Sequence, residues 1–179
     1  MEERTDESLM IAVSRGDEQA FAELMQRHLN ALHHYASRLT RSPSGADDLI
    51  QETWLAVWRR AGTFKPRKVR LSTWLHRILH NRYVDSVRRN RLVLDEAVVA
   101  AAPDIHDLGE AAEAAQRKAL LDNAIAELPV QQKAAILLTH QQGLTNQEVA
   151  VVMGLSVRAV ESQLARARRT LKDRLRESR

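Results

Sequence analysis

The spacing of apolar residues constrains the fold more than any other feature of this sequence. Apolar side chains recur every three or four positions along almost the whole chain, and only six glycines and four prolines interrupt its 179 residues. This spacing aligns apolar side chains on one face of an α-helix, whereas a half-buried strand requires strict alternation. The sequence therefore predicts an all-α protein, long enough for one ordinary domain or two small ones.

Capping and turn residues divide this pattern into separate helices. Asp6 and Asp17 are expected to cap two amino-terminal helices, because their short side chains accept hydrogen bonds from free backbone N–H groups. A turn over residues 42–45 precedes the next helix. Later helices are expected over residues 46–61, 72–91 with Ser72 as the cap, 108–128 and 129–143.

The tail of the chain has the spacing of a helix-turn-helix. Thr145 and Glu148 form a predicted capping box, in which the hydroxyl and the carboxylate each accept a hydrogen bond from a free backbone N–H group. The short helix that follows closes at Gly154, and Ala150 permits a close approach of the next helix. We therefore expect a short helix, a tight turn and a longer second helix.

That second helix runs from its cap Ser156 to about Arg176, with an apolar stripe of Val157, Val160, Leu164, Ala167, Leu171 and Leu175. Its opposite face carries side chains that can reach base edges in a major groove, namely Arg158, Glu161, Ser162, Ala165 and Arg166. Phosphate contacts, which position a protein without specifying a sequence, are expected from Arg168, Arg169, Lys172 and Arg174. Ser156 is also expected to contact DNA. The alternative is a solvated basic helix.

Charge is distributed along the chain in four blocks of alternating sign. Residues 1–58 hold five Arg/Lys against ten Asp/Glu, and residues 59–91 hold eleven against one. Residues 92–155 hold three against nine, and residues 156–179 hold eight against three. Solvated surfaces normally mix their signs, so two separate basic blocks predict two contacts with a polyanion.

The first basic block also contains aromatic residues, Phe64, Trp74 and Tyr83. Stacking rings beside cationic side chains are typical of surfaces that bind single-stranded nucleic acid. For Trp74 itself, a place in the hydrophobic core is nearly as good an interpretation. The cluster as a whole favours an anionic partner.

Several other classes of function are disfavoured. The chain has no cysteine, which excludes disulfides and thiolate zinc sites. Its acidic amino terminus has no long apolar stretch, so we expect neither a signal peptide nor a membrane-spanning helix. His76 and His80 lie one helical turn apart, but they lie in a basic block that repels cations, so we expect no metal or cofactor.

Two motif groups resemble the sigma-70 family of RNA polymerase sigma factors, and specifically its extracytoplasmic-function (ECF) group. Asp47 to Trp54 is similar to the segment by which the first domain of the family grips polymerase. Residues 72–89 are similar to the helix that opens and captures the −10 promoter element. Leu128, Pro129, Gln132 and the helix-turn-helix resemble the second domain, so the resemblance covers about residues 6–176.

The resemblance implies partners and residues for each contact. Core polymerase would bind through its β′ clamp helices to Asp47, Asp48, Gln51, Glu52 and Trp54, and through its β flap to the second domain. The −10 element would meet Phe64, Lys65, Arg67, Trp74, Asn81, Asp85, Arg88 and Arg89. The −35 element would meet the final helix, in which Glu161 and Gln163 depart from the basic residues common in the family. An anti-sigma factor is also implied.

These observations predict two small helical domains, residues 1–91 and 113–179, joined by a flexible acidic linker over residues 92–112. The chain is expected to be a non-enzymatic, cytoplasmic specificity subunit that recognises promoter DNA and opens it. Three alternatives remain: a helix-turn-helix regulator that acts without polymerase, a sigma-like decoy that sequesters an anti-sigma factor, and a metal-dependent enzyme that uses His76 and His80.

Overall fold

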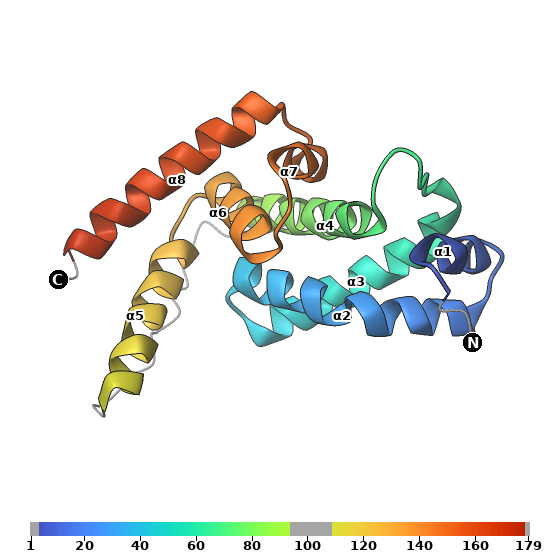
Figure 1. The fold of residues 1–179 in the computed structure, drawn as a ribbon, viewed down its shortest axis with the longest axis horizontal. Helices are drawn as coiled ribbons and strands as arrows, with labels where there is room; N and C mark the ends of the chain where they lie inside the picture. The colour runs from blue at the N-terminus through green and yellow to red at the C-terminus, as the bar shows by residue number, and fades with distance from the viewer. Residues whose placement is uncertain (1–3, 94–108, 178–179) are drawn as a thin grey trace.

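A computed structural model describes residues 4–93 and 109–177, and every regular element in those two ranges is helical (Figure 1). The all-α prediction is confirmed, whereas the predicted flexibility of the linker lies mostly outside the described residues. In chain order the elements are α1 (Asp6–Ser14), α2 (Glu18–Thr40), α3 (Pro43–Arg60), the 3-10 turn η1 (Ala61–Thr63), α4 (Leu71–Val93), α5 (Gly109–Ala126), α6 (Val130–Ile136), the π-helical turn η2 (Leu137–Gln141), α7 (Asn146–Met153) and α8 (Val157–Glu177).

Some helix starts differ from the sequence prediction by one to three residues. Asp17 caps α2 as expected, but Thr5 caps α1, because its hydroxyl accepts the N–H of Ser8 and leaves Asp6 inside the first turn. Helix α3 begins at Pro43, so the predicted turn over residues 42–45 is instead its capped first turn. The prediction placed the proline in the turn, although proline also suits the first helical position.

The cap predicted at Ser72 is wrong. Helix α4 begins at Leu71, and the N–H of Trp74 donates to the carbonyl of Arg70, which places Ser72 inside the first turn. Leu71 is buried, and burial of this apolar side chain favours an earlier helix start than the capping pattern suggests.

The first half of the molecule is a bundle of α1 to α4, on the right in Figure 1. Helices α2 and α3 pack against each other, and α4 packs against both. Phe21 on α2 makes edge contacts with Trp54 and Trp58 on α3, with ring centroids 5.7 and 5.0 Å apart. Tyr83 on α4 donates to the carbonyl of Leu39 over 3.2 Å, tying α4 to the end of α2.

The second half contains the predicted helix-turn-helix, formed by α7 and α8. The capping box of Thr145 and Glu148 is confirmed, and Gly154 closes α7 with a φ of 65°. Ser156 accepts the N–H of Ala159 over 3.2 Å, as expected of the cap of α8. The apolar stripe of α8 is buried in its middle, but Val157, at the start of the stripe, is 38% exposed.

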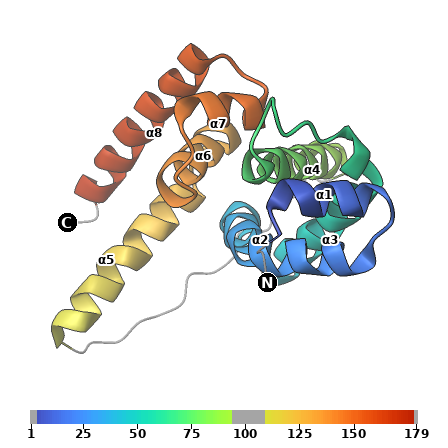
Figure 2. The same cartoon turned by 45° about the vertical axis from the view of Figure 1, so that its right-hand side comes forward.

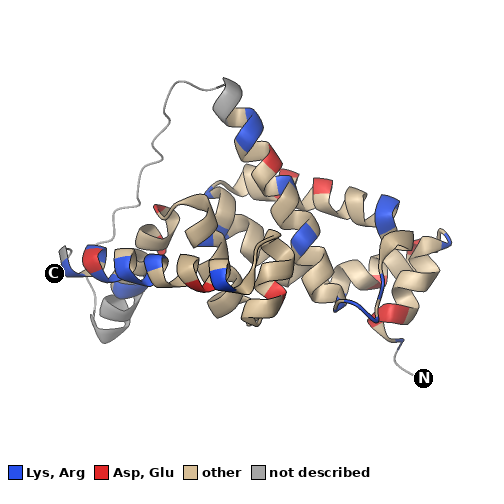
Figure 3. Cartoon of the chain, turned by 90° about the horizontal axis from the view of Figure 1, so that it is seen from above, with Lys and Arg blue, Asp and Glu red and all other residues tan. Residues whose placement is uncertain are grey.

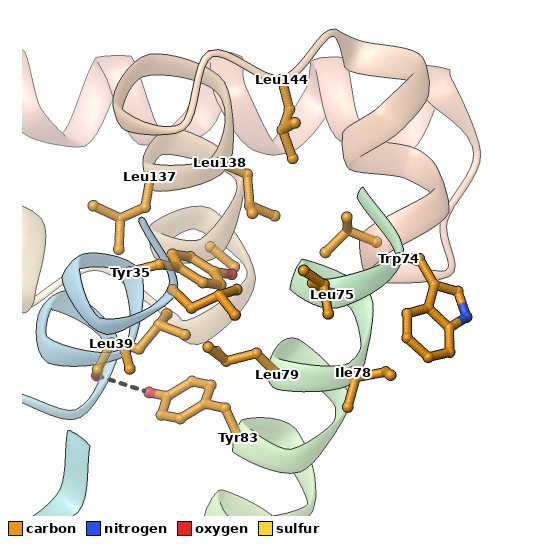
Figure 4. Close-up of a cluster of buried hydrophobic side chains, with 14 of the residues drawn as sticks. Tyr35, Leu39, Trp74, Leu75, Ile78, Leu79, Tyr83, Leu137, Leu138 and Leu144 are labelled. Carbon is orange, nitrogen blue, oxygen red and sulfur yellow. Dashed lines mark hydrogen bonds between the residues drawn. The ribbon is translucent and has the colours of Figure 1, made fainter. Parts of the chain in front are cut away.

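The two halves share one hydrophobic core. Leu137, Leu138 and Leu144 of the second half pack against side chains of α2 and α4, as Figure 4 shows. Helix α7 packs against α4, while α8 extends away from the first bundle in both views of the ribbon (Figures 1 and 2). The molecule is therefore two helical units joined by a continuous packed interior.

Candidate nucleic-acid and polymerase interface

The outward face of α8 carries nine of the ten residues predicted to meet duplex DNA, whereas the tenth, Arg174, is half-buried and pairs with Glu127. All nine of these side chains are exposed: Ser156, Arg158, Glu161, Ser162, Ala165, Arg166, Arg168, Arg169 and Lys172. Val160 and Leu164 are buried on the opposite face and fix the rotation of the helix. Figure 3 shows several Lys and Arg positions along α8. The helix can therefore present this face to a major groove without rearrangement.

Gln163 is held within the second half. Its Nε2 donates to Oε1 of Gln131 at the start of α6 over 3.0 Å, and the side chain is half-buried. A side chain tied to its own domain is less free to read a base, so Gln163 positions α8 against α6. The sequence shows Gln163 as a departure from the family but gives no signal for this contact.

The second basic surface comprises the loop before α4 and the exposed side of α4. Lys65 and Arg67 are exposed on the loop, which is marked by its blue segments in Figure 3. Phe64 is half-buried and lies against Trp74, with ring centroids 5.5 Å apart. Trp74 is only 9% exposed. The ring available at this surface is therefore Phe64, with Trp74 as its support.

Four further residues of this surface lie on one stripe of α4. Asn81, Asp85, Arg88 and Arg89 are spaced three and four positions apart, and all four are exposed. Their neighbour Tyr83 is buried, and burial raises the pKa of its hydroxyl. The stripe offers amide, carboxylate and guanidinium groups, which together can hydrogen-bond unpaired bases and phosphates.

An acidic surface lies on α3. Asp47, Asp48, Gln51 and Glu52 are exposed, whereas Trp54 is 4% exposed and packs into the bundle. Beside them is an apolar groove of about 500 Å³, lined mainly by Phe21, Met25, Leu29, Ile50, Leu55 and Trp58. Leu55, at 49% exposure, shows that part of this groove is open surface.

The two histidines considered as metal ligands are buried in α4 and bonded to other groups. Nδ1 of His76 lies 2.7 Å from the carbonyl oxygen of Ser72, and Nε2 lies 3.2 Å from Oε1 of Gln142. His80 lies 3.3 Å from the hydroxyl of Tyr35, and burial lowers its pKa to about 4. In the ranges the structure describes, no cluster of three or more ligand side chains is suited to a metal ion.

Comparison with known proteins covers most of the chain. Residues 24–93 match the family Sigma-70 region 2, and residues 118–171 match Sigma-70, region 4. The ECF RNA polymerase sigma factor SigM of Mycobacterium tuberculosis is 32% identical over 169 residues, covering 94% of this chain and 84% of SigM. The chain belongs to the ECF group of the sigma-70 family. As a sigma factor it directs promoter-specific transcription initiation by RNA polymerase.

Other relatives of this sigma factor extend the comparison. The ECF sigma factor RpoE of Cereibacter sphaeroides is 30% identical over 182 residues, covering 99% of this chain and 98% of RpoE. The structure of CnrH in complex with the cytosolic domain of CnrY matches with a TM-score of 0.72 and 28% identity, covering 97% of this chain and 99% of CnrH. The structure of RpoE with the anti-sigma factor NepR from Bartonella quintana matches with a TM-score of 0.70, 25% identity, and coverage of 89% and 98%.

The resemblance inferred from the motifs is thus confirmed at the level of the family and its two regions. Among the described helices of this sigma factor, none combines the length and the apolar character needed to cross a membrane. The roles of individual side chains stay predictions.

Proposed function

We propose that this sigma factor binds polymerase and the two promoter elements through three surfaces. The acidic face of α3 and the adjacent apolar groove bind the β′ clamp helices of core polymerase. The loop before α4 and the exposed stripe of α4 bind the opened −10 element. Helix α8 binds the −35 element. The observation that carries this proposal is that the acidic face of α3, the loop and stripe of α4, and the outward face of α8 are all exposed.

The domain boundaries follow the same division. We propose that residues 1–91 form the polymerase-binding and −10 domain, that residues 113–179 form the −35 domain, and that residues 92–112 connect them. The matched family regions, residues 24–93 and 118–171, fall almost entirely within these two domains and support the assignment.

At the −10 surface, Phe64 is the side chain best placed to stack on an unpaired base, because it is half-buried and braced by Trp74. Asn81 and Asp85 offer hydrogen-bonding groups to base edges. Lys65, Arg67, Arg88 and Arg89 neutralise phosphates. The DNA duplex at the −10 element then opens because the sigma factor binds the separated strand preferentially. We propose no enzymatic activity for the chain.

At the −35 surface, base-reading and phosphate-binding residues respond differently to substitution. We expect Arg166→Ala to weaken discrimination at one base pair by about 1–3 kcal/mol, whereas Lys172→Ala weakens binding to all sequences nearly equally. Binding of holoenzyme to a library of −35 variants at two salt concentrations measures both effects. Equal loss of discrimination in the two variants would contradict the division of roles on α8.

Regulation by an anti-sigma factor is part of the proposal. RpoE from Bartonella quintana, similar to this chain in fold, was solved with the anti-sigma factor NepR, and CnrH was solved with the cytosolic domain of CnrY. A partner helix with an apolar face suits the groove beside α3, because Leu55 and the half-buried Trp58 leave apolar surface uncovered there. We propose that the sigma factor acts in the cytoplasm, where polymerase and chromosomal DNA meet.

Runoff transcription tests the proposed function as a whole. Core polymerase with this sigma factor and a library of genomic fragments is expected to produce start sites that core polymerase alone does not use. The shared sequences upstream of those sites then define the two elements. If no new start sites appear while a known ECF sigma factor succeeds with the same core enzyme, the proposed function is wrong for this chain and its polymerase.

A further inference from the structure

Glu161 is the one acidic side chain in the first three turns of α8, residues 157–167. In a helix-turn-helix, the amino-terminal part of the second helix is the part that contacts base edges. DNA carries a dense row of phosphates, so a carboxylate at this place weakens binding to every sequence unless a hydrogen-bond donor meets it. A carboxylate on this basic surface therefore indicates a donor on the DNA itself.

The packing of α8 directs the Glu161 side chain outward. Val160 and Leu164 are 0% and 2% exposed on the inner face, which fixes the rotation of the helix. Glu161 is exposed, and within the part of the chain that the structure describes it takes part in no hydrogen bond or ion pair. Gln163, the other departure from the family pattern, is instead tied to Gln131 over 3.0 Å. Of these two departures, Glu161 is therefore the one available to DNA.

The neighbours of Glu161 on the same stripe of α8 are apolar. Val157 and Ala165 lie four positions before and after it, and both side chains are exposed. Neither side chain offers a donor to the carboxylate, and each excludes water from one side of it once the helix lies in a groove. A carboxylate shielded from water needs a hydrogen bond from its new surroundings, because an unpaired buried charge is costly. The surroundings of Glu161 therefore favour a direct bond to a base edge.

The groups that bases present in the major groove distinguish one base as the partner of a carboxylate, which can only accept hydrogen bonds. Cytosine presents its N4 amino group as a donor and no acceptor of its own. Adenine places the N7 acceptor beside its N6 amino group, guanine presents N7 and O6, and thymine presents O4. Cytosine is therefore the base to which a carboxylate can bond without facing an acceptor of the same base.

We propose that Glu161 determines specificity at one position of the −35 element, where its carboxylate accepts a hydrogen bond from the amino group of a cytosine. This inference rests on the proposed function of α8 and adds to it the base and the residue that reads it. Glu161 and Arg166 are five residues apart, which is about 7.5 Å along the helix axis or about two base pairs. We therefore expect the cytosine within about two base pairs of the position at which Arg166 discriminates.

Binding of holoenzyme to a DNA library with all four bases at each −35 position tests the inference. With the unchanged protein, we expect cytosine to be preferred over every other base at one position, by about 10-fold or more. At that same position, Glu161→Gln is expected to shift the preference to adenine and Glu161→Arg to guanine, since these side chains match the paired groups of those bases. The preferences at other positions should stay the same. Misfolding cannot produce this result, because it weakens all preferences together.

The matched control is Asp173→Arg, which makes the same change in charge at an exposed position later in α8. We expect it to strengthen binding to all library members nearly equally and to leave the order of bases unchanged, as a phosphate-contacting charge does. If Glu161→Arg gives the same result as Asp173→Arg, Glu161 is only a solvated charge and the inference is overturned. A responding position at which the unchanged protein prefers a base other than cytosine would also overturn it.

Runoff transcription separates this inference from the proposed function. On a promoter in which the preferred cytosine is replaced by guanine, the unchanged protein is expected to lose about 10-fold in initiation, and Glu161→Arg to recover most of that loss. No recovery, with normal initiation by the unchanged protein on the original promoter, would contradict the role of Glu161 alone. A protein that starts transcription but shows no preference at any −35 position would contradict the proposed role of α8, and the inference with it.

Discussion

Replacing Asp48 and Glu52 together by lysine is expected to lower promoter-specific transcription by about 100-fold or more, because truncation of central interface residues already costs about 2–4 kcal/mol and reversed charges add repulsion. Both residues are exposed on α3, one turn apart, so neither supports the interior of the bundle. DNA is an anion and gains nothing from these carboxylates. Their place on the surface therefore favours a protein partner.

The measurement is the dissociation constant for core polymerase, together with runoff transcription at saturating DNA. Glu7→Lys with Glu18→Lys is the matched control, because it makes the same change in net charge at exposed positions of the same half. The control is expected to retain polymerase binding within about threefold, as isolated surface substitutions usually do. Equal losses in the two double variants would show that overall charge, and not the α3 surface, controls assembly.

The free energy of unfolding is expected to fall by about 3 kcal/mol between pH 6.5 and pH 4 through His80 alone, at about 1.4 kcal/mol per unit of pKa difference. His80 is 5% exposed, and burial lowers its pKa from 6.5 to about 4. In that range the unfolded chain binds a proton at this position and the folded chain does not. The contribution of His80 to the free energy of unfolding is therefore complete above pH 6.5 and decreases as the pH falls toward 4.

Urea denaturation at several pH values measures this dependence. His80→Gln retains a polar partner for the hydroxyl of Tyr35 but cannot titrate, so its free energy of unfolding should depend less on pH. Asn123→Ala, at an exposed position and without a titratable side chain, should keep the dependence of the unchanged protein. Parallel pH profiles for His80→Gln and the unchanged protein would rule out His80 as the source. His76 adds to the effect in the same direction, because burial lowers its pKa too.

Features encoded by neighbouring residues were predictable from the sequence. The capping box of Thr145 and Glu148 and the turn at Gly154 depend on side chains and backbone within a few positions, and both are confirmed. The predicted cap at Ser72 was wrong because burial of Leu71 favours an earlier start of α4. Val157 lies on the predicted apolar stripe but is exposed, because helical periodicity gives the direction of a side chain and not whether another element covers it at the helix end.

The contacts between distant segments could not be predicted in this way. His76 and its partner Gln142 are 66 positions apart. Nothing in the local pattern distinguishes such a histidine from a metal ligand or a solvated residue. Trp54 and Trp74 show the same ambiguity, since a large aromatic residue beside charged positions is typical of both a binding surface and a core, and both side chains are buried here.

The shared core of the two halves has a consequence for protein engineering. Exchanging the second half of one ECF sigma factor for that of a relative is an attractive way to change promoter preference. Such an exchange assumes that each half folds independently of the other. In this protein, Leu137, Leu138 and Leu144 come from the second half but belong to the same buried cluster as Tyr35 and Leu79 of the first. A functional chimera must therefore have complementary side chains on both sides of the interface between the two halves, or carry compensating substitutions there.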